Sequence, residues 1–247
     1  MTHLLFLGEP TAVRAAVVGE PLILDGAEGR HAATVVRVRA GQHIYVSDGQ
    51  GRRVLVETAS VERSVVHGTV VEVCDEPAPS PAFVLVQALA KGDRDEQAVE
   101  AATELGVDEV LPWQAERSVV VWRPDRVARS VSRWEAVVTR ATKQSRRCRM
   151  PLTSAPVDLA GLVKRVTRSR LTLVLHESAD PPLSSVPLPD SGEVLIVVGP
   201  EGGISERELD ALMTAGAHPV RLGHTILRAS SAGPAALAVL SARARWS

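Results

Sequence analysis

The stretch "VLIVVGPEGGISERELD", residues 194–210, joins a strand pattern to a helix pattern through a loop rich in glycine. Its first five residues are apolar, as in a strand that is buried on both faces of a parallel sheet. Ser205 and Glu208 have the S-x-x-E spacing of a capping box, so we predict that a helix begins there. Gly199, Gly202 and Gly203 then follow the carboxyl end of a strand, where open α/β sheets bind ligands.

The loop before this helix admits two interpretations, a tight structural connection or a ligand site. It matches neither G-x-x-x-x-G-K-[ST] nor G-x-G-x-x-G, which excludes the familiar phosphate and dinucleotide loops. Glu201 would repel a pyrophosphate, so a ligand here is neutral or cationic, such as an adenosine that carries a sulfonium. The helix itself is predicted to bury Leu209, Leu212 and Met213 and to end at Gly216.

Strand and helix patterns alternate from residue 83 onward, which predicts a parallel sheet with crossover helices. The apolar runs expected as strands are residues 83–89, 107–113, 171–177 and 193–199, and the amphipathic helices are residues 93–106 and 123–145. The fold class is therefore α/β.

A second glycine element occupies residues 220–242. A short strand, 220–222, meets Gly223, and an Ala/Leu-rich helix follows with Pro234 near its start. Arg228 stands between two apolar residues, so its side chain either caps this helix or points into a pocket. Two bare loops that follow two strands of one sheet are placed to line a common pocket.

Residues 1–73 contain mostly strand patterns and no long helical period, which predicts a small β-barrel. Residues 34–59 alternate apolar and polar residues around Asp48-Gly49, a hairpin signal. Residues 64–73 add a strand pair or one bent strand. Pro77, Pro79 and Pro81 then disfavour both helix and central strand. We therefore expect domains at 1–75 and 83–247, with a linker at 76–82.

The composition is that of a globular protein, with 247 residues, 45% hydrophobic residues and a formal net charge of -1. Cys74 and Cys148 have no metal-ligand spacing and indicate no disulfide framework, which fits a reducing compartment. The N-terminus lacks the features of a signal peptide. No apolar run approaches the roughly 20 residues of a membrane helix. We expect a cytoplasmic protein without membrane contact and without metal.

The segment Arg123–Arg149 carries eight arginines and one lysine against Asp125 and Glu135. Clustered arginine is the electrostatic footprint of a phosphate backbone, so we favour contact with RNA or DNA over a solvated helix face. Aromatic residues make up only 3% of the chain, so base stacking is not expected to dominate recognition.

Several motifs occur together in the order and spacing of one family: "KGDRDEQAVEAATELGVDEVLPW", "ERS", "ATKQSRR", "LHE", "VGPEGGISERE" and "LGHTILRASSA". The chain resembles the bacterial RsmE-type methyltransferases of the SPOUT superfamily, over nearly its whole length. The resemblance implies S-adenosylmethionine as cofactor and N3 of a decoding-region uridine in 16S rRNA of the small ribosomal subunit as target. It also implies a PUA-like N-terminal β-barrel, a deep trefoil knot in the C-terminal domain and a homodimer.

Positions that match the family's motifs give the expected site. The cofactor-binding residues would be Leu175, His176, Glu177, Val198, Gly199, Pro200, Glu201, Gly202, Gly203, Leu222, Gly223, Ile226, Leu227, Arg228, Ser231 and Ala232. The RNA-binding residues would be Arg30, His31, Arg37, Lys91, Arg94, Arg117, Lys143, Gln144, Ser145, Arg146 and Arg147.

The chain departs from the family pattern at four places. Ser230 and Ser231 replace a Glu-Thr pair, Ala101 replaces a lysine, Arg146 replaces a glycine and Lys143 replaces a carboxylate. The roles of those two carboxylates therefore do not carry over to this chain.

The chemistry must deal with the uracil N3–H, which is a weak acid. An enzyme can supply a base or stabilise the uridinate with cations. With two family carboxylates replaced, we favour Arg147 and Arg228 as stabilisers and keep Glu201 as the candidate base. Two alternatives stay open: a SPOUT enzyme that methylates another RNA position, such as a ribose 2′-hydroxyl, and a non-catalytic RNA-binding assembly factor.

Overall fold

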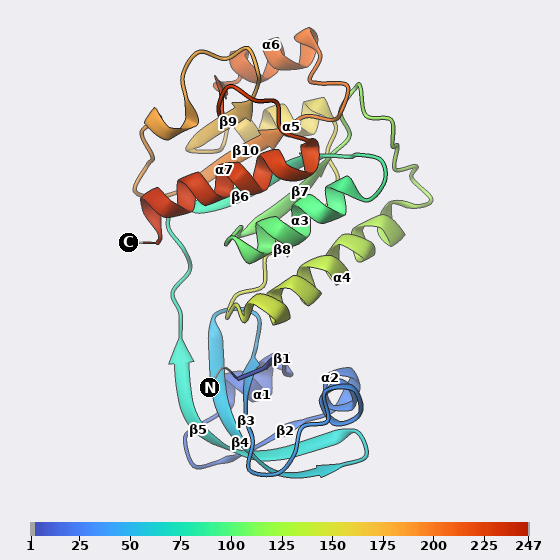
Figure 1. Cartoon of the computed structure of the whole chain (residues 1–247), viewed down its shortest axis with the longest axis vertical. Helices are drawn as coiled ribbons and strands as arrows, with labels where there is room; N and C mark the ends of the chain where they lie inside the picture. Colours follow the sequence, from blue (N-terminus) through green and yellow to red (C-terminus); the bar gives the residue numbers. More distant parts are fainter. Residues whose placement is uncertain (1–2, 247) are drawn as a thin grey trace. The chain divides into compact units, whose positions relative to one another are not determined.

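The computed structural model describes residues 3–246, which form two compact units (Figure 1). The first unit contains Met1–Ala78 together with Thr142–Met150, and the second contains Pro79–Ala141 and Pro151–Ser247. The chain therefore enters the second unit, returns to the first for a short segment and then completes the second. No local sequence pattern marks this return, because its first residues, 142–145, continue the preceding helix without a break.

The first unit is built on one curled five-stranded sheet. Its strands are β1 (Leu5–Leu7), β2 (Pro21–Leu24), β3 (His43–Ser47), β4 (Arg52–Glu62) and β5 (Val65–Asp75), in the order β1-β3-β4-β5-β2. β1 runs parallel to β3, and the other pairs are antiparallel. β1 and β2 lie at the two edges of this sheet, so the predicted barrel is open.

The predicted hairpin at Asp48-Gly49 is confirmed between β3 and β4. Asp48 Oδ1 accepts hydrogen bonds from the backbone N–H groups of Gln50 at 2.6 Å and Arg52 at 3.0 Å. Gly49 has φ 69°, a left-handed conformation that suits glycine. Local turn chemistry is thus sufficient to set this connection.

The predicted strand is wrong at Thr34–Val36, where the structure has a π-helix, His31–Val36. This helix continues α2 (Gly26–Arg30), and α1 (Pro10–Ala15) precedes both. A Cβ on Gly29 would lie 2.4 Å from the carbonyl oxygen of Ser64, so the bare backbone lets α2 pack very closely on the sheet. Tertiary packing therefore overrides the local alternation of residue types.

The second unit contains the predicted parallel sheet. Its strands are β6 (Ala82–Ala88), β7 (Glu109–Trp113), β8 (Leu152–Thr153), β9 (Leu171–Leu175), β10 (Glu193–Val198) and β11 (His218–Val220). Their order is β11-β9-β10-β6-β7-β8, and all neighbours are parallel. The last strand begins and ends two residues earlier than the predicted 220–222, and Arg221 beyond it exchanges backbone hydrogen bonds with Pro181 and Leu183.

Helices cover both faces of this sheet (Figure 1). α3 (Arg94–Glu104), the first part of α4 (Val127–Ser145) and α7 (Ala229–Ala244) pack on one face, and α5 (Leu159–Val166) and α6 (Glu206–Thr214) pack on the other. The capping box of α6 is confirmed, with Ser205 as N-cap and Glu208 at the third helical position. Leu212 is buried as predicted, but Met213 is 47% exposed and lies outside the buried stripe.

The end of the chain packs against the connection between β9 and β10. Arg243 donates to the carbonyl oxygens of Leu183 and Val186, and Arg221 N–H donates to the carbonyl oxygen of Pro181. The trefoil knot that the resemblance implies stays a prediction. Within residues 3–246, no helix combines the length and the apolar character that crossing a bilayer requires.

Candidate active site

A cavity of about 590 Å³ opens at the carboxyl ends of β9, β10 and β11. These strands are adjacent and parallel, so the loops that leave them meet at one edge of the sheet. The volume lies in the range of small-molecule sites, which is roughly 300–1,000 Å³. The cavity belongs entirely to the second unit.

The cavity brings together nearly all of the predicted cofactor residues from three separate segments. Its lining includes Leu175, His176, Glu177, Val198, Gly199, Pro200, Glu201, Gly202, Gly203, Leu222, Gly223, Ile226, Leu227, Arg228 and Ala232. Ser231 is outside the lining, and its backbone N–H donates to the carbonyl oxygen of Arg228 at 2.8 Å. Arg94 and Arg117, which were predicted to contact RNA, also line it. The lining also contains His224 and Thr225 from the predicted loop 222–228, and Ile204, Arg221 and Ala229, which the sequence analysis did not single out.

The glycines of the cavity are bare for different reasons. A Cβ on Gly199 would lie 2.7 Å from Ile204 Cγ1, so this glycine allows the loop to pack on itself. Gly203 has φ +74°, and Gly202 lies against the backbone and side chain of Arg117. These three positions therefore have structural reasons to be glycine. A Cβ on Gly223 would meet no atom within 4 Å, so only the open cavity faces that backbone.

Glu201 is held at the mouth of the cavity by two groups from one segment. Its Oε1 accepts from the backbone N–H of Lys91 at 3.3 Å and from the guanidinium of Arg94 at 3.1 Å. Lys91 and Arg94 follow β6, whose neighbour in the sheet is β10. The motif "KGDRDE" is thus joined to the motif "GPEGG" by direct contacts, which the distance of 110 residues between Lys91 and Glu201 concealed.

Arg228 is the N-cap residue of α7, and its backbone is extended with φ −67° and ψ 154°. Its side chain makes no cap hydrogen bond, which leaves the second of the two predicted possibilities, a guanidinium at the cavity. Within residues 3–246 no ion pair involves it. A fixed backbone with an exposed guanidinium suits a ligand that carries negative charge.

Several positive charges of the basic segment Arg123–Arg149 form ion pairs within the chain, so fewer of them are available to RNA than the composition indicates. α3 supplies acids that the local sequence lacks: Arg133 pairs with Glu96 at 2.6 Å, and Arg140 pairs with Glu100 at 3.6 Å. In the first unit, Lys143 Nζ lies 2.7 Å from Glu28 Oε1, and both side chains are about four-fifths buried. These charges are therefore largely engaged within the chain.

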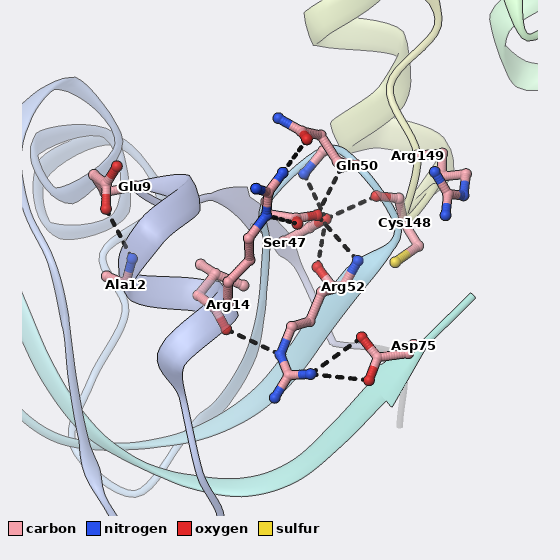
Figure 2. Close-up of polar contacts among 12 residues, drawn as sticks. Glu9, Ala12, Arg14, Ser47, Gln50, Arg52, Asp75, Cys148 and Arg149 are labelled. Atoms are coloured by element: carbon pink, nitrogen blue, oxygen red, sulfur yellow. Dashed lines mark hydrogen bonds and ion pairs between the residues drawn. The ribbon is translucent and has the colours of Figure 1, made fainter. Parts of the chain in front are cut away.

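The segment Thr142–Met150 is fastened to the sheet of the first unit. The hydroxyl of Ser47 donates to the carbonyl oxygen of Cys148 at 2.8 Å, and Figure 2 shows this contact beside Arg52 and Asp75. Arg149 donates to the carbonyl oxygens of Glu76 and Pro77. Burial raises the pKa of the Cys148 thiol to about 11, with a smaller contribution from the Glu76 carboxylate.

The remaining predicted RNA-binding residues lie in the first unit. They are Arg30, His31 and Arg37 around the π-helix, and Gln144, Ser145, Arg146 and Arg147 at the end of α4. Arg37 and Arg146 both adopt φ 59°, and Arg146 stands where the family has glycine. Arg147 is not in the lining of the cavity of the second unit, so the structure does not bring it together with Arg228 and Glu201 there.

No group of three or more His, Cys, Asp or Glu side chains within residues 3–246 has the geometry of a metal site. Cys74 and Cys148 are both free thiols. The polar groups at the cavity are instead carboxylates, imidazoles and guanidinium groups from the loops described above.

The chain matches known proteins over almost its entire length. Residues 76–241 match the family described as the RNA methyltransferase domain, and residues 24–64 match the RNA methyltransferase PUA domain. The chain belongs to the RNA methyltransferase family. The predicted family, the PUA domain and the α/β architecture are thereby confirmed.

Relatives and solved structures agree with this assignment. The ribosomal RNA small subunit methyltransferase E of Mycobacterium bovis is 42% identical over 235 residues, which cover 92% of this chain and 89% of that protein. The Bacillus subtilis protein of the same name is 30% identical and covers 88% of each chain. The crystal structure of the Neisseria gonorrhoeae protein of that name, bound to S-adenosylmethionine, superposes with a TM-score of 0.85 at 26% identity over 98% of both chains.

Proposed function

We propose that this protein uses S-adenosylmethionine to methylate N3 of a decoding-region uridine in 16S rRNA. The observation that carries the proposal is the cavity at the ends of β9, β10 and β11, where Gly223 faces only open space. The relatives with the highest identity given above are named as small-subunit rRNA methyltransferases, and one structural neighbour binds S-adenosylmethionine. The uridine and its N3 atom rest on the motif resemblance.

The cavity fits the proposed cofactor in size and charge. Its volume suits an adenosine with an amino-acid tail, and four glycines are among its lining residues. Glu177 and Glu201 complement a cationic sulfonium. When bound, S-adenosylmethionine supplies an electrophilic methyl carbon.

The residues of the chain must then prepare the uracil ring. Arg228, which lines the cavity, would stabilise negative charge on a carbonyl oxygen of the ring as N3 loses its proton. Glu201 Oε1 already accepts from Lys91 and Arg94, so a proton from N3 would be accepted by Oε2. Arg147 is proposed as a second stabiliser on its motif position alone.

Further assignments belong to the same proposal. The small ribosomal subunit is the proposed partner, and the active protein is proposed to be a homodimer in the cytoplasm. The proposed domains are a PUA-like domain (1–75) and a SPOUT domain (83–247), which the linker 76–82 joins. Arg30, His31, Arg37, Gln144, Ser145, Arg146 and Arg147 are the proposed RNA contacts in the first unit. Arg133, Arg140 and Lys143 are weaker candidates for RNA contact, because acids within the chain engage them.

The test is product identification. Small ribosomal subunits that lack the modification are incubated with the protein and S-adenosylmethionine, and the RNA is digested to nucleosides for mass spectrometry. The proposal predicts N3-methyluridine as the newly formed methylated nucleoside. A 2′-O-methyl nucleoside would support the alternative SPOUT activity, and binding to subunits without any methylated product would support a non-catalytic assembly factor.

A further inference from the structure

A closed ring of hydrogen bonds joins the loop after β7 to the start of α6. Glu208 Oε1 accepts from the backbone N–H of Glu116 at 2.7 Å, and Glu116 Oε2 accepts from the hydroxyl of Ser205 at 2.7 Å. The backbone N–H of Ser205 returns a bond to Glu208 Oε2 at 3.0 Å. Two loops that are about 90 residues apart in sequence are thereby held together.

Glu208 has a larger part in this ring than a helix cap requires. A capping box needs one carboxylate oxygen, which accepts from the N-cap backbone, and Oε2 serves that purpose here. The second oxygen, Oε1, is committed to the neighbouring loop at Glu116. The side chain is 1% exposed, so both bonds lie in a region with little competition from water.

The loop that this ring holds carries Arg117. Arg117 Nη1 donates to the carbonyl oxygen of Gly202 at 3.3 Å, and a Cβ on Gly202 would lie 3.1 Å from Arg117 Cβ. The guanidinium therefore lies over the glycine loop at the mouth of the cavity, on the exposed side of the ring. The hydrogen bond from the Ser205 hydroxyl and, to a smaller extent, the nearby Arg207 guanidinium lower the pKa of Glu116, which keeps its carboxylate charged.

We propose that Glu208 is a positioning residue for RNA binding, which acts by holding Arg117 at the mouth of the cofactor cavity. The ligand of Arg117 is an oxygen of the RNA substrate, a phosphate or a uracil carbonyl, which a guanidinium recognises with charge-assisted hydrogen bonds. This inference rests on the proposed function and deepens it, because it assigns a role in substrate binding to a buried residue that no substrate reaches.

The experiment is a double-mutant cycle on affinity for RNA. The dissociation constant of the full-length protein for unmodified small subunits is measured at one fixed salt concentration for the wild type, Arg117→Ala, Glu208→Gln and the double variant. Arg117→Ala is expected to raise Kd about tenfold, the scale of one hydrogen bond to a charged group. Glu208→Gln keeps one acceptor oxygen of two, so Kd should rise about three- to tenfold. The double variant should match Arg117→Ala, because the two residues act as one element.

The matched control is Glu206→Gln, which removes a charge of the same sign from the first turn of α6 at an exposed position. It should leave Kd unchanged within about twofold, since an exposed charge near a helix terminus contributes little. Affinity for S-adenosylmethionine should stay within about threefold in Glu208→Gln. If this variant fails to fold, Glu116→Ala breaks the same ring at an exposed carboxylate, and it should raise Kd about threefold without adding to Arg117→Ala.

Three results would overturn the inference: independent, multiplying effects in the double variant, no effect of Glu208→Gln on Kd, or an equal effect of Glu206→Gln. Subunit binding is measured apart from methyl transfer, so the proposed reaction can fail on its own. A wild-type protein that binds subunits but transfers no methyl group refutes the reaction and leaves the cycle valid. A wild-type protein that does not bind subunits refutes both.

Discussion

The glycine loops of the second unit and the basic segment Arg123–Arg149 were the two strongest functional signals in the sequence. They differ in whether the structure brings their predicted residues together in one site. The loops after β9, β10 and β11 form one cavity, and their predicted residues line it. The basic segment divides between the two units, and acids from α3 and from Glu28 engage much of its charge. The conformation of a glycine loop follows from its own residues, whereas the availability of a charged side chain for binding depends on ion-pair partners elsewhere in the chain.

The largest effect is expected for the guanidinium at the cavity. Arg228→Ala should lower turnover on small subunits about 10²- to 10³-fold, the scale of one lost donor to a developing negative charge. Arg129→Ala, an exposed arginine of the basic segment, should change turnover less than threefold. Single-turnover rates at saturating cofactor measure both variants. Equal losses in the two would mean that the basic segment matters as much as the cavity.

A smaller effect, on stability, is expected from removing a residue of the basic segment that forms an ion pair within the chain. Lys143→Met leaves the largely buried Glu28 carboxylate without its cation, so the free energy of unfolding should fall by about 1–2 kcal/mol. Arg126→Met removes an exposed pair with Asp125 and should cost less than about 0.5 kcal/mol. Urea unfolding compares the two variants. Unchanged stability in Lys143→Met, with a more than tenfold loss of subunit affinity, would instead make Lys143 an RNA contact.

The left-handed backbone at Arg146 offers a gain in stability. A non-glycine residue at φ 59° destabilises the folded state by roughly 1–2 kcal/mol, and replacing it with glycine removes this strain. Glycine also gives the unfolded chain more conformational entropy, which offsets about half of the stabilisation. Arg146→Gly should therefore raise the free energy of unfolding by up to about 1 kcal/mol. Chemical denaturation checks the sign, and a loss of stability would show that the contacts of Arg146 outweigh the strain.

The last comparison concerns thiol chemistry. Cys148 is buried with a pKa raised to about 11 by burial, so almost none of its thiol is ionised at pH 8. Cys74 is only half-buried. A thiol reagent should therefore modify Cys74 at least about 100-fold faster than Cys148 in the folded protein, and both at similar rates in denaturant. Rapid labelling of native Cys148 would show that Thr142–Met150 leaves the sheet of the first unit readily.

The same contrast explains how far the sequence predicted the structure. The parallel sheet and the capping box at Ser205 follow from patterns that span few residues, and both are confirmed. The π-helix at His31–Val36 was missed, because residues 34–36 begin a segment whose residue types alternate as in a strand. The contacts of Glu208 with Glu116 and of Lys143 with Glu28 were missed too. The neighbouring sequence of a carboxylate does not show whether it pairs with a residue far away in the chain or stays exposed to solvent.

The most direct test of the central claim, that the cavity at Gly223 holds the cofactor, is a calorimetric titration with S-adenosylmethionine. We predict micromolar binding to the wild type and at least about a 100-fold weaker Kd for Gly223→Val, because the new side chain occupies open space in the cavity. The thermal midpoint should not change, since a Cβ at Gly223 meets no atom within 4 Å. Equal affinities of the two proteins would place the cofactor elsewhere and contradict the account.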